Sequence, residues 1–112
     1  MTAIEEALFI DGSAHCISAF SWSPEALALT LHPWFREDVV VQAHFAQPCL
    51  VSFDDSHAGE ERGLPWDIIA FDSKPLPGGG GWRFCVHTDC NEYVFDATWP
   101  QITRFVISQR QG

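Results

Sequence analysis

Apolar side chains recur at every second position through most of this chain, most clearly between residues 82 and 97. A period of two places alternate side chains on one face of a β-strand. Two such sets stand on either side of a short break: Trp82, Phe84 and Val86, then Tyr93, Phe95 and Ala97. A two-residue loop (Cys90-Asn91) or a four-residue loop (Thr88 to Asn91) brings both sets onto a shared face. The segment is therefore predicted to be an antiparallel hairpin with an aromatic core face.

A second hairpin is predicted between residues 14 and 32. Cys16, Ser18, Phe20 and Trp22 share one parity, and Leu27, Leu29 and Leu31 alternate after the turn at residues 23–26. A four-residue turn pairs Trp22 with Leu27 and Phe20 with Leu29, so the apolar sets meet. The competing interpretation is a helix capped by Ser23 with Pro24 at its first position. The period of two in the leucines favours the strand.

Further strands follow from the same pattern. Residues 38–46 alternate strongly, and Cys49, Val51 and Phe53 predict another strand. Residues 66–71 are apolar on both parities apart from Asp67, as in a strand buried on both faces. Residues 74–81 are predicted to be a flexible connector, and residues 102–107 a closing strand or a short helix after Pro100.

The element count defines the fold class. About six to eight short strands at spacings of about ten residues are typical of an all-β fold, here a small antiparallel sandwich or a partly open barrel. Thr2-Ala3-Ile4-Glu5 has the spacing of a capping box and predicts a short helix ended by Asp11-Gly12. We expect one domain over residues 1–112, with helix and turn at 1–12 and a tail at 108–112.

Composition limits the classes of partner. Only 19% of residues are charged, while nine Phe and five Trp are present, so part of the surface is expected to be apolar. This favours self-association, most simply as a homodimer. The net charge of −9, with six scattered basic residues, argues against nucleic acid and favours a basic protein partner. The same acidity also keeps a small protein soluble.

We expect neither a targeting segment nor a membrane span in this chain. Residues 1–10 carry Glu5 and Glu6 where a secretory signal would have a basic start. No apolar run approaches the roughly 20 residues of a membrane helix. We therefore expect a cytoplasmic protein whose cysteines stay reduced, without structural disulfides.

One cluster could bind a metal. Cys85-x-His87-x-x-Cys90 gathers soft ligands near a predicted turn, and His15 or Cys16 could add a fourth. However, the spacing is not that of a zinc finger, and Cys85 and His87 fall on the outer face of their strand. We expect no zinc and no other cofactor.

The segment between residues 54 and 65 is predicted to be a long polar loop. It carries Asp54, Asp55, His57, Glu60 and Glu61. Neighbours in sequence are not evidence for a catalytic triad, and the pattern of a calcium loop is missing. Its length exceeds the usual four to six residues, so it is a candidate contact surface.

Three functional classes remain open at this point. The first is a non-catalytic acidic interaction module, self-associating or binding a basic protein, as a toxin-neutralising protein would. The second is a small metal-dependent or hydrolytic enzyme using Cys85, His87 and Cys90. The third is a small-molecule binder with an aromatic pocket. The absence of any catalytic motif and the acidic, aromatic-rich composition favour the first class.

Overall fold

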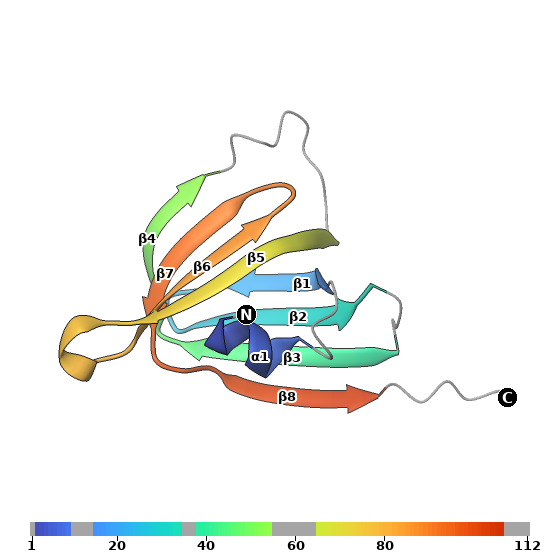
Figure 1. Cartoon of the computed structure of the whole chain (residues 1–112), viewed down its shortest axis with the longest axis horizontal. Coiled ribbons are helices and arrows are strands. Elements are labelled where there is room, and N and C mark those ends of the chain that lie inside the picture. Colours follow the sequence, from blue (N-terminus) through green and yellow to red (C-terminus); the bar gives the residue numbers. More distant parts are fainter. Residues whose placement is uncertain (1, 10–14, 35–37, 55–64, 107–112) are drawn as a thin grey trace, which may run out of the picture.

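The computed structural model describes residues 2–9, 15–34, 38–54 and 65–106 of the chain. The elements in chain order are α1 (Ala3–Leu8), β1 (His15–Trp22), β2 (Ala26–Pro33), β3 (Val39–Ala46), β4 (Cys49–Asp54), β5 (Trp66–Pro75), a 3-10 turn (Pro77–Gly79), β6 (Trp82–Thr88), β7 (Glu92–Ala97) and β8 (Gln101–Val106). The eight strands form one antiparallel sheet in the order β4-β7-β6-β5-β1-β2-β3-β8 (Figure 1). The all-β prediction is confirmed, and the sheet is not closed into a barrel.

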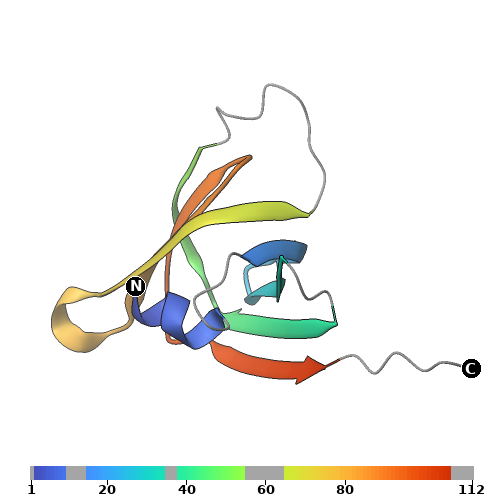
Figure 2. The same ribbon diagram turned by 45° about the vertical axis from the view of Figure 1, so that its right-hand side comes forward.

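The sheet folds over on itself, so that its two halves face each other across a core (Figure 2). Phe45 on β3 packs against Phe84 on β6 and Phe95 on β7, with ring centroids 5.0 Å apart in both pairs. All three rings are fully buried. The inward parity predicted for residues 82–97 is therefore confirmed at Phe84 and Phe95, while Trp82 and Tyr93 pack at the margin of the core.

The β1–β2 hairpin has the predicted register near its turn. Trp22 lies opposite Leu27 and Phe20 opposite Leu29. A bulge between Ile17 and Ala19 then changes the parity of β1, because one extra residue stands unpaired. The expectation that Cys16 shares a face with Phe20 is therefore wrong.

Two further predictions are confirmed with changes. The β6–β7 hairpin places His87 opposite Glu92, the register of the four-residue loop, and the Thr88 N–H donates to the Asn91 carbonyl at 2.8 Å. Residues 101–106 form strand β8 and not a helix.

The prediction for residues 66–71 is wrong in two respects. Ile69 is 62% exposed, so β5 is not buried on both faces. β5 also continues to Pro75, four residues further than residue 71, into the segment predicted to be a connector. A bulge between Ile68 and Ala70 interrupts the alternation of inward and outward side chains along β5. The sequence could not indicate this bulge, because residues 66–71 are apolar on both parities apart from Asp67.

The predicted helix is present, and its capping box has a second role. The Thr2 hydroxyl accepts from the Glu5 N–H, and the Thr2 N–H donates to the Glu5 carboxylate. The same two side chains bind the backbone of Phe71 on β5, whose carbonyl accepts from Thr2 at 2.6 Å and whose N–H donates to Glu5 at 3.3 Å. Among the described residues, β5 pairs with β1 only at Cys16 and Ile17, so the hydrogen bonds from α1 satisfy backbone groups of β5 that β1 does not reach.

The helix also reaches the far edge of the sheet. Arg104 on β8 donates to the Ala7 carbonyl, so α1 bridges β5 and β8 (Figures 1 and 2). Ile4 and Leu8 are fully buried and complete the core beneath the helix. The predicted stop at Asp11-Gly12 and the tail at 108–112 lie outside the described residues.

Candidate functional site

A small apolar hollow opens where β4 and β7 curve over the end of β1. It measures about 190 Å³, and we call it the aromatic hollow. Its lining residues are Phe20, Trp22, Leu50, Phe53 and Tyr93.

The β1–β2 register and one bulge bring these side chains together. Phe20 lies opposite Leu29 and Trp22 opposite Leu27, so both point to the same side as the buried leucines of β2. A bulge in β4, between Leu50 and Ser52, sets Leu50 opposite Phe95 and Phe53 opposite Tyr93. Without it, Leu50 and Phe53 would point to opposite faces of the sheet, because they are three positions apart.

The rings around the hollow form a continuous array. Tyr93 stacks on Phe20 with centroids 5.0 Å apart and on Phe53 with centroids 4.8 Å apart. Trp66 extends the array, with its ring centroid 5.6 Å from that of Phe20. Stacked pairs of this kind contribute about 0.5–1.5 kcal/mol each beyond their burial, so the walls of the hollow are held in place.

Among the described residues, the hollow borders an open strand edge. β4 is the last strand of the sheet on its side, and all six of its residues are exposed. Leu50, Val51 and Phe53 are each between 45% and 49% exposed. β4 itself carries no Lys and no Pro, two residues that commonly protect an edge strand from pairing.

The strands that build the hollow carry carboxylates but no Lys or Arg. β1, β4 and β7 contain no Lys or Arg, whereas β4 and β7 contain Asp54, Glu92 and Asp96. Asp96 is bound by Arg83 of β6, whose Nε donates at 2.8 Å. This hydrogen bond and the guanidinium charge lower the pKa of Asp96, and the same contact raises the pKa of Arg83. Asp54 and Glu92 lie opposite each other in the β4–β7 register.

The predicted metal ligands lie on different parts of the fold. Cys85 and His87 are on β6 with side chains on the outer face, as predicted, and Cys90 is buried in the β6–β7 turn. His15 and Cys16 are buried on β1. Within the described part of the chain, no three His, Cys, Asp or Glu side chains are grouped to hold a metal ion.

The thiols are held in different surroundings. Burial raises the pKa of Cys85, with smaller contributions from the carboxylates of Glu92 and Asp72. None of the four cysteines forms a disulfide; Cys49 is exposed, and Cys16 and Cys90 are buried.

One contact between a thiol and an imidazole was not predicted from the sequence. Cys16 lies opposite His32 in the β1–β2 register, with Sγ 3.2 Å from Nε2 and 3.7 Å from Nδ1. These nearly equal distances place the sulfur over the ring face, since a sulfur on the Nε2 lone pair would lie far from Nδ1. Nδ1 donates to the Pro33 carbonyl at 3.0 Å. The pair is therefore a packing contact and not an aligned nucleophile and base.

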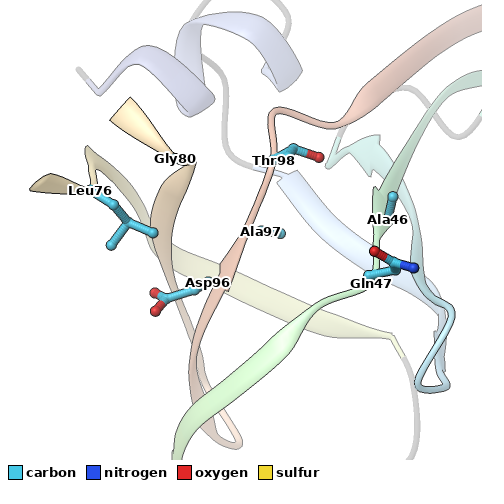
Figure 3. Close-up of a pocket in the computed structure, with 7 residues that line it drawn as sticks. All are labelled: Ala46, Gln47, Leu76, Gly80, Asp96, Ala97 and Thr98. Carbon is cyan, nitrogen blue, oxygen red and sulfur yellow. The ribbon is translucent and has the colours of Figure 1, made fainter. Parts of the chain in front are cut away.

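Two other hollows are more polar. One, of about 230 Å³, is lined by Ala46, Gln47, Leu76, Gly80, Asp96, Ala97 and Thr98. Figure 3 shows that the Gln47 amide and the Asp96 carboxylate do not converge there, and Asp96 is already bound to Arg83. The other, of about 260 Å³, lies on the outer face of β2, β3 and β8 and includes Thr30, Gln42 and His44.

The predicted contact loop is described only at its two ends, residues 54 and 65. Asp54 ends β4, next to the aromatic hollow. Asp55, His57, Glu60 and Glu61 lie outside the described residues.

The wider comparisons give no family assignment. No helix among the described residues has the length and apolar character needed to cross a lipid bilayer. Neither a protein-family model, nor a curated protein, nor a solved structure matches this chain.

Proposed function

We propose that this protein is a non-catalytic interaction module that binds a protein partner through the aromatic hollow and the adjoining edge of β4. The observation that carries the proposal is that hollow and edge share two residues, Leu50 and Phe53. A chain that pairs with β4 would therefore lie beside an apolar recess. Strand addition of this kind draws affinity from main-chain hydrogen bonds and specificity from side-chain recesses.

The size of the hollow favours a side chain over a free small molecule. Ligand pockets for small molecules usually measure about 300–1,000 Å³. The aromatic hollow, at about 190 Å³, is smaller and has room for one large side chain or a fragment. This supports a protein partner over the third functional class.

Self-association is the second candidate function. Both ends of the sheet carry exposed apolar residues, since Phe105 and Val106 on β8 are 42% and 61% exposed. Pairing of two β4 edges about a two-fold axis would give a closed dimer, whereas β4–β8 pairing would continue into an open chain of copies.

A photo-crosslinking experiment tests the proposal. Benzoylphenylalanine replaces Val51 at the β4 edge or, as a control, Ile69 on β5, which is at least as exposed. Irradiation in the native host is expected to give a discrete adduct from position 51 and none from position 69. Phe53→Ser is expected to abolish the adduct. The absence of an adduct at position 51, or equal adducts at both positions, would contradict the proposal.

The mass of the adduct separates the two candidate functions. An adduct whose mass is a whole multiple of this 12.6 kDa chain indicates self-association. An adduct of any other mass indicates a different protein as the partner.

A further inference from the structure

We infer that two copies of this chain pair through β8, antiparallel and about a two-fold axis at Thr103, so that their sheets become continuous. β8 ends the sheet on the side opposite to β4, so this contact is separate from the binding surface proposed above. Among the described residues, the side of β8 away from β3 has no strand beside it, and its backbone groups can pair with another chain.

Charge is divided unevenly between the two halves of the sheet, and this favours β8 as the contact between copies. β1, β2, β3 and β8 contain no Asp or Glu, and Arg104 is their only Lys or Arg. β4, β7, β6 and β5 together contain five carboxylates and only two cations. Each copy carries a net charge of −9, so two copies repel each other least where neither brings carboxylates to the contact. β8 is the end of the sheet that meets this condition.

The described carboxylates around this half of the sheet stand at its margins. Glu25 lies in the β1–β2 turn, Asp38 precedes β3, and α1 carries two glutamates in its first turn. Arg104 donates to the Ala7 carbonyl, so the cation of β8 faces this acidic helix. A contact centred on β8 would therefore have few charges in its middle and a charged rim, the usual arrangement in protein interfaces.

β8 can also form an uninterrupted ladder. It pairs with β3 from Val106 to Gln101 without a bulge. β4, in contrast, has a bulge between Leu50 and Ser52, which would interrupt a β4–β4 ladder near its centre. Pairing of β4 with β8 would add acidic copies one after another without closing. Of the three edge pairings, β8–β8 is the one that is both regular and closed.

The faces of β8 restrict the register of this ladder. Ile102 and Arg104 lie opposite Ala43 and Val41, which are buried, so both point to the inner side of the sheet. Thr103, between them, points to the outer side and is exposed. Opposite residues of an antiparallel pair share a face, so a symmetric β8–β8 ladder must set one residue opposite its own copy.

Thr103 fits that position. Axes at Ile102 or Phe105 would pair only three residues of each β8 strand. An axis at Arg104 would set two guanidinium groups opposite each other, and like charges directly opposite are destabilising. An axis at Thr103 sets two Thr side chains together, a favourable cross-strand pair, and places Gln101 beside Phe105 of the other copy. Ile102 then lies beside the aliphatic stem of Arg104.

Sedimentation velocity of the full chain over about 10–500 µM measures the pairing. A contact made by one pair of short strands buries less than roughly 1,200 Å², so the expected Kd is on the order of 10–100 µM. The 12.6 kDa monomer should therefore give way to a dimer within this range. A monomer at every concentration would overturn the inference.

Opposite charges at position 103 test the axis. Thr103→Asp and Thr103→Lys each set like charges opposite each other, so each variant should dimerise at least about tenfold more weakly than the parent. An equimolar mixture sets Asp opposite Lys, and its heterodimer should form with a Kd within about threefold of the parent value. This rescue requires that position 103 face its own copy. A mixture as weak as the separate variants would overturn the two-fold register.

A matched pair of variants one strand further in provides the control. Gln42 lies opposite Thr103 on β3, is exposed on the same outer face, and is separated from the edge by β8. Gln42→Asp and Gln42→Lys change the net charge equally but should alter the Kd by less than about twofold, because solvent screens charges at this separation. Equal weakening by the variants at positions 42 and 103 would indicate packing through the outer face and would overturn edge pairing. Thermal melts check that each variant folds.

The β8 contact and the β4 binding surface can be tested separately. Phe53→Ser on β4 should leave the dimer unchanged. If it abolished the dimer while the Thr103 variants still paired, the copies would meet through β4 and the inference would be overturned. A discrete adduct of another protein at position 51, with no dimer in sedimentation, would overturn the inference alone. A dimer sensitive to position 103, with no adduct at position 51, would overturn the proposed function alone.

Discussion

Phe45 links the two halves of the folded sheet, and its truncation tests the packing directly. Its ring is fully buried and meets Phe84 and Phe95 edge to face, at interplanar angles of 69° and 86°. Truncating a buried Phe to Ala costs about 3–5 kcal/mol, through lost burial and the cavity that remains. A domain of this size has a total stability of about 5–15 kcal/mol. Phe45→Ala should therefore remove a large share of it.

The assay is urea unfolding followed by tryptophan fluorescence, with a thermal melt as a second probe. We expect the midpoint of the melt to fall by about 10–20 °C and the urea dependence of the free energy to stay unchanged. Phe84→Ala and Phe95→Ala should cost about 3–5 kcal/mol as well. Phe105→Ala, which truncates a 42% exposed ring, should cost less than about 1 kcal/mol and serves as the control.

A double-mutant cycle isolates the contact between the halves. Phe45→Ala and Phe95→Ala, alone and combined, should show a coupling of about 0.5–1.5 kcal/mol, because the rings touch. If Phe45→Ala melted within a few degrees of the parent protein, β3 would not pack on β6 and β7. Strict additivity of the two variants would contradict the direct ring contact.

Three further predictions concern the helix, the thiols and one ion pair. Thr2→Ala removes the helix cap and a bond to β5, and should cost about 1–2 kcal/mol of unfolding free energy in denaturant titration. Iodoacetamide at pH 8 should alkylate the exposed Cys49 before Cys85, whose raised pKa leaves less thiolate, as followed by peptide mass spectrometry. Arg83 lowers the pKa of Asp96, so the pair stabilises the folded protein above about pH 4, and this contribution is lost as the pH falls through the lowered pKa. Asp96→Asn should therefore lose less stability than the parent on acidification below about pH 4, as measured by thermal melts.

The regular parts of the fold were predictable because their signal is local. The pairing of Phe20 with Leu29 and of Trp22 with Leu27 follows from the period of two and a four-residue turn. The capping box at Thr2 is likewise a local pattern. Its contact with Phe71 joins residues 69 positions apart, which no sequence spacing could indicate.

The bulges explain most of the errors. One extra residue in β1, β4 or β5 exchanges the two faces of a strand beyond that point. The alternation of Cys49, Val51 and Phe53 predicted the strand correctly but could not show that Leu50 and Phe53 share a face. The aromatic hollow depends on that exchange, so its lining could not be assembled from the sequence.

The candidate site was foreseen only in general terms. The surplus of aromatic residues predicted an apolar surface or pocket, and the low charged fraction predicted association. The choice of β4 as the relevant edge depends on strand order, because β4 follows β3 in sequence but pairs with β7 in the sheet. Cys85 and His87 were candidate metal ligands only because thiols and imidazoles commonly bind metals. Strand parity predicted their position on the outer face, and it could predict nothing more about them.

The most direct test of the binding surface is a backbone and indole ¹H–¹⁵N NMR titration of the full chain with a seven-residue probe peptide that alternates Val or Phe with Ser. The account predicts that the largest shift changes occur at Leu50, Val51, Phe53 and Tyr93 and at the Trp22 indole. Amides of β4 whose N–H groups face outward should also become protected from exchange. Changes centred on Phe105 and Val106 of β8, or spread evenly over the sheet, would contradict the assignment of the β4 edge and the aromatic hollow as the binding surface.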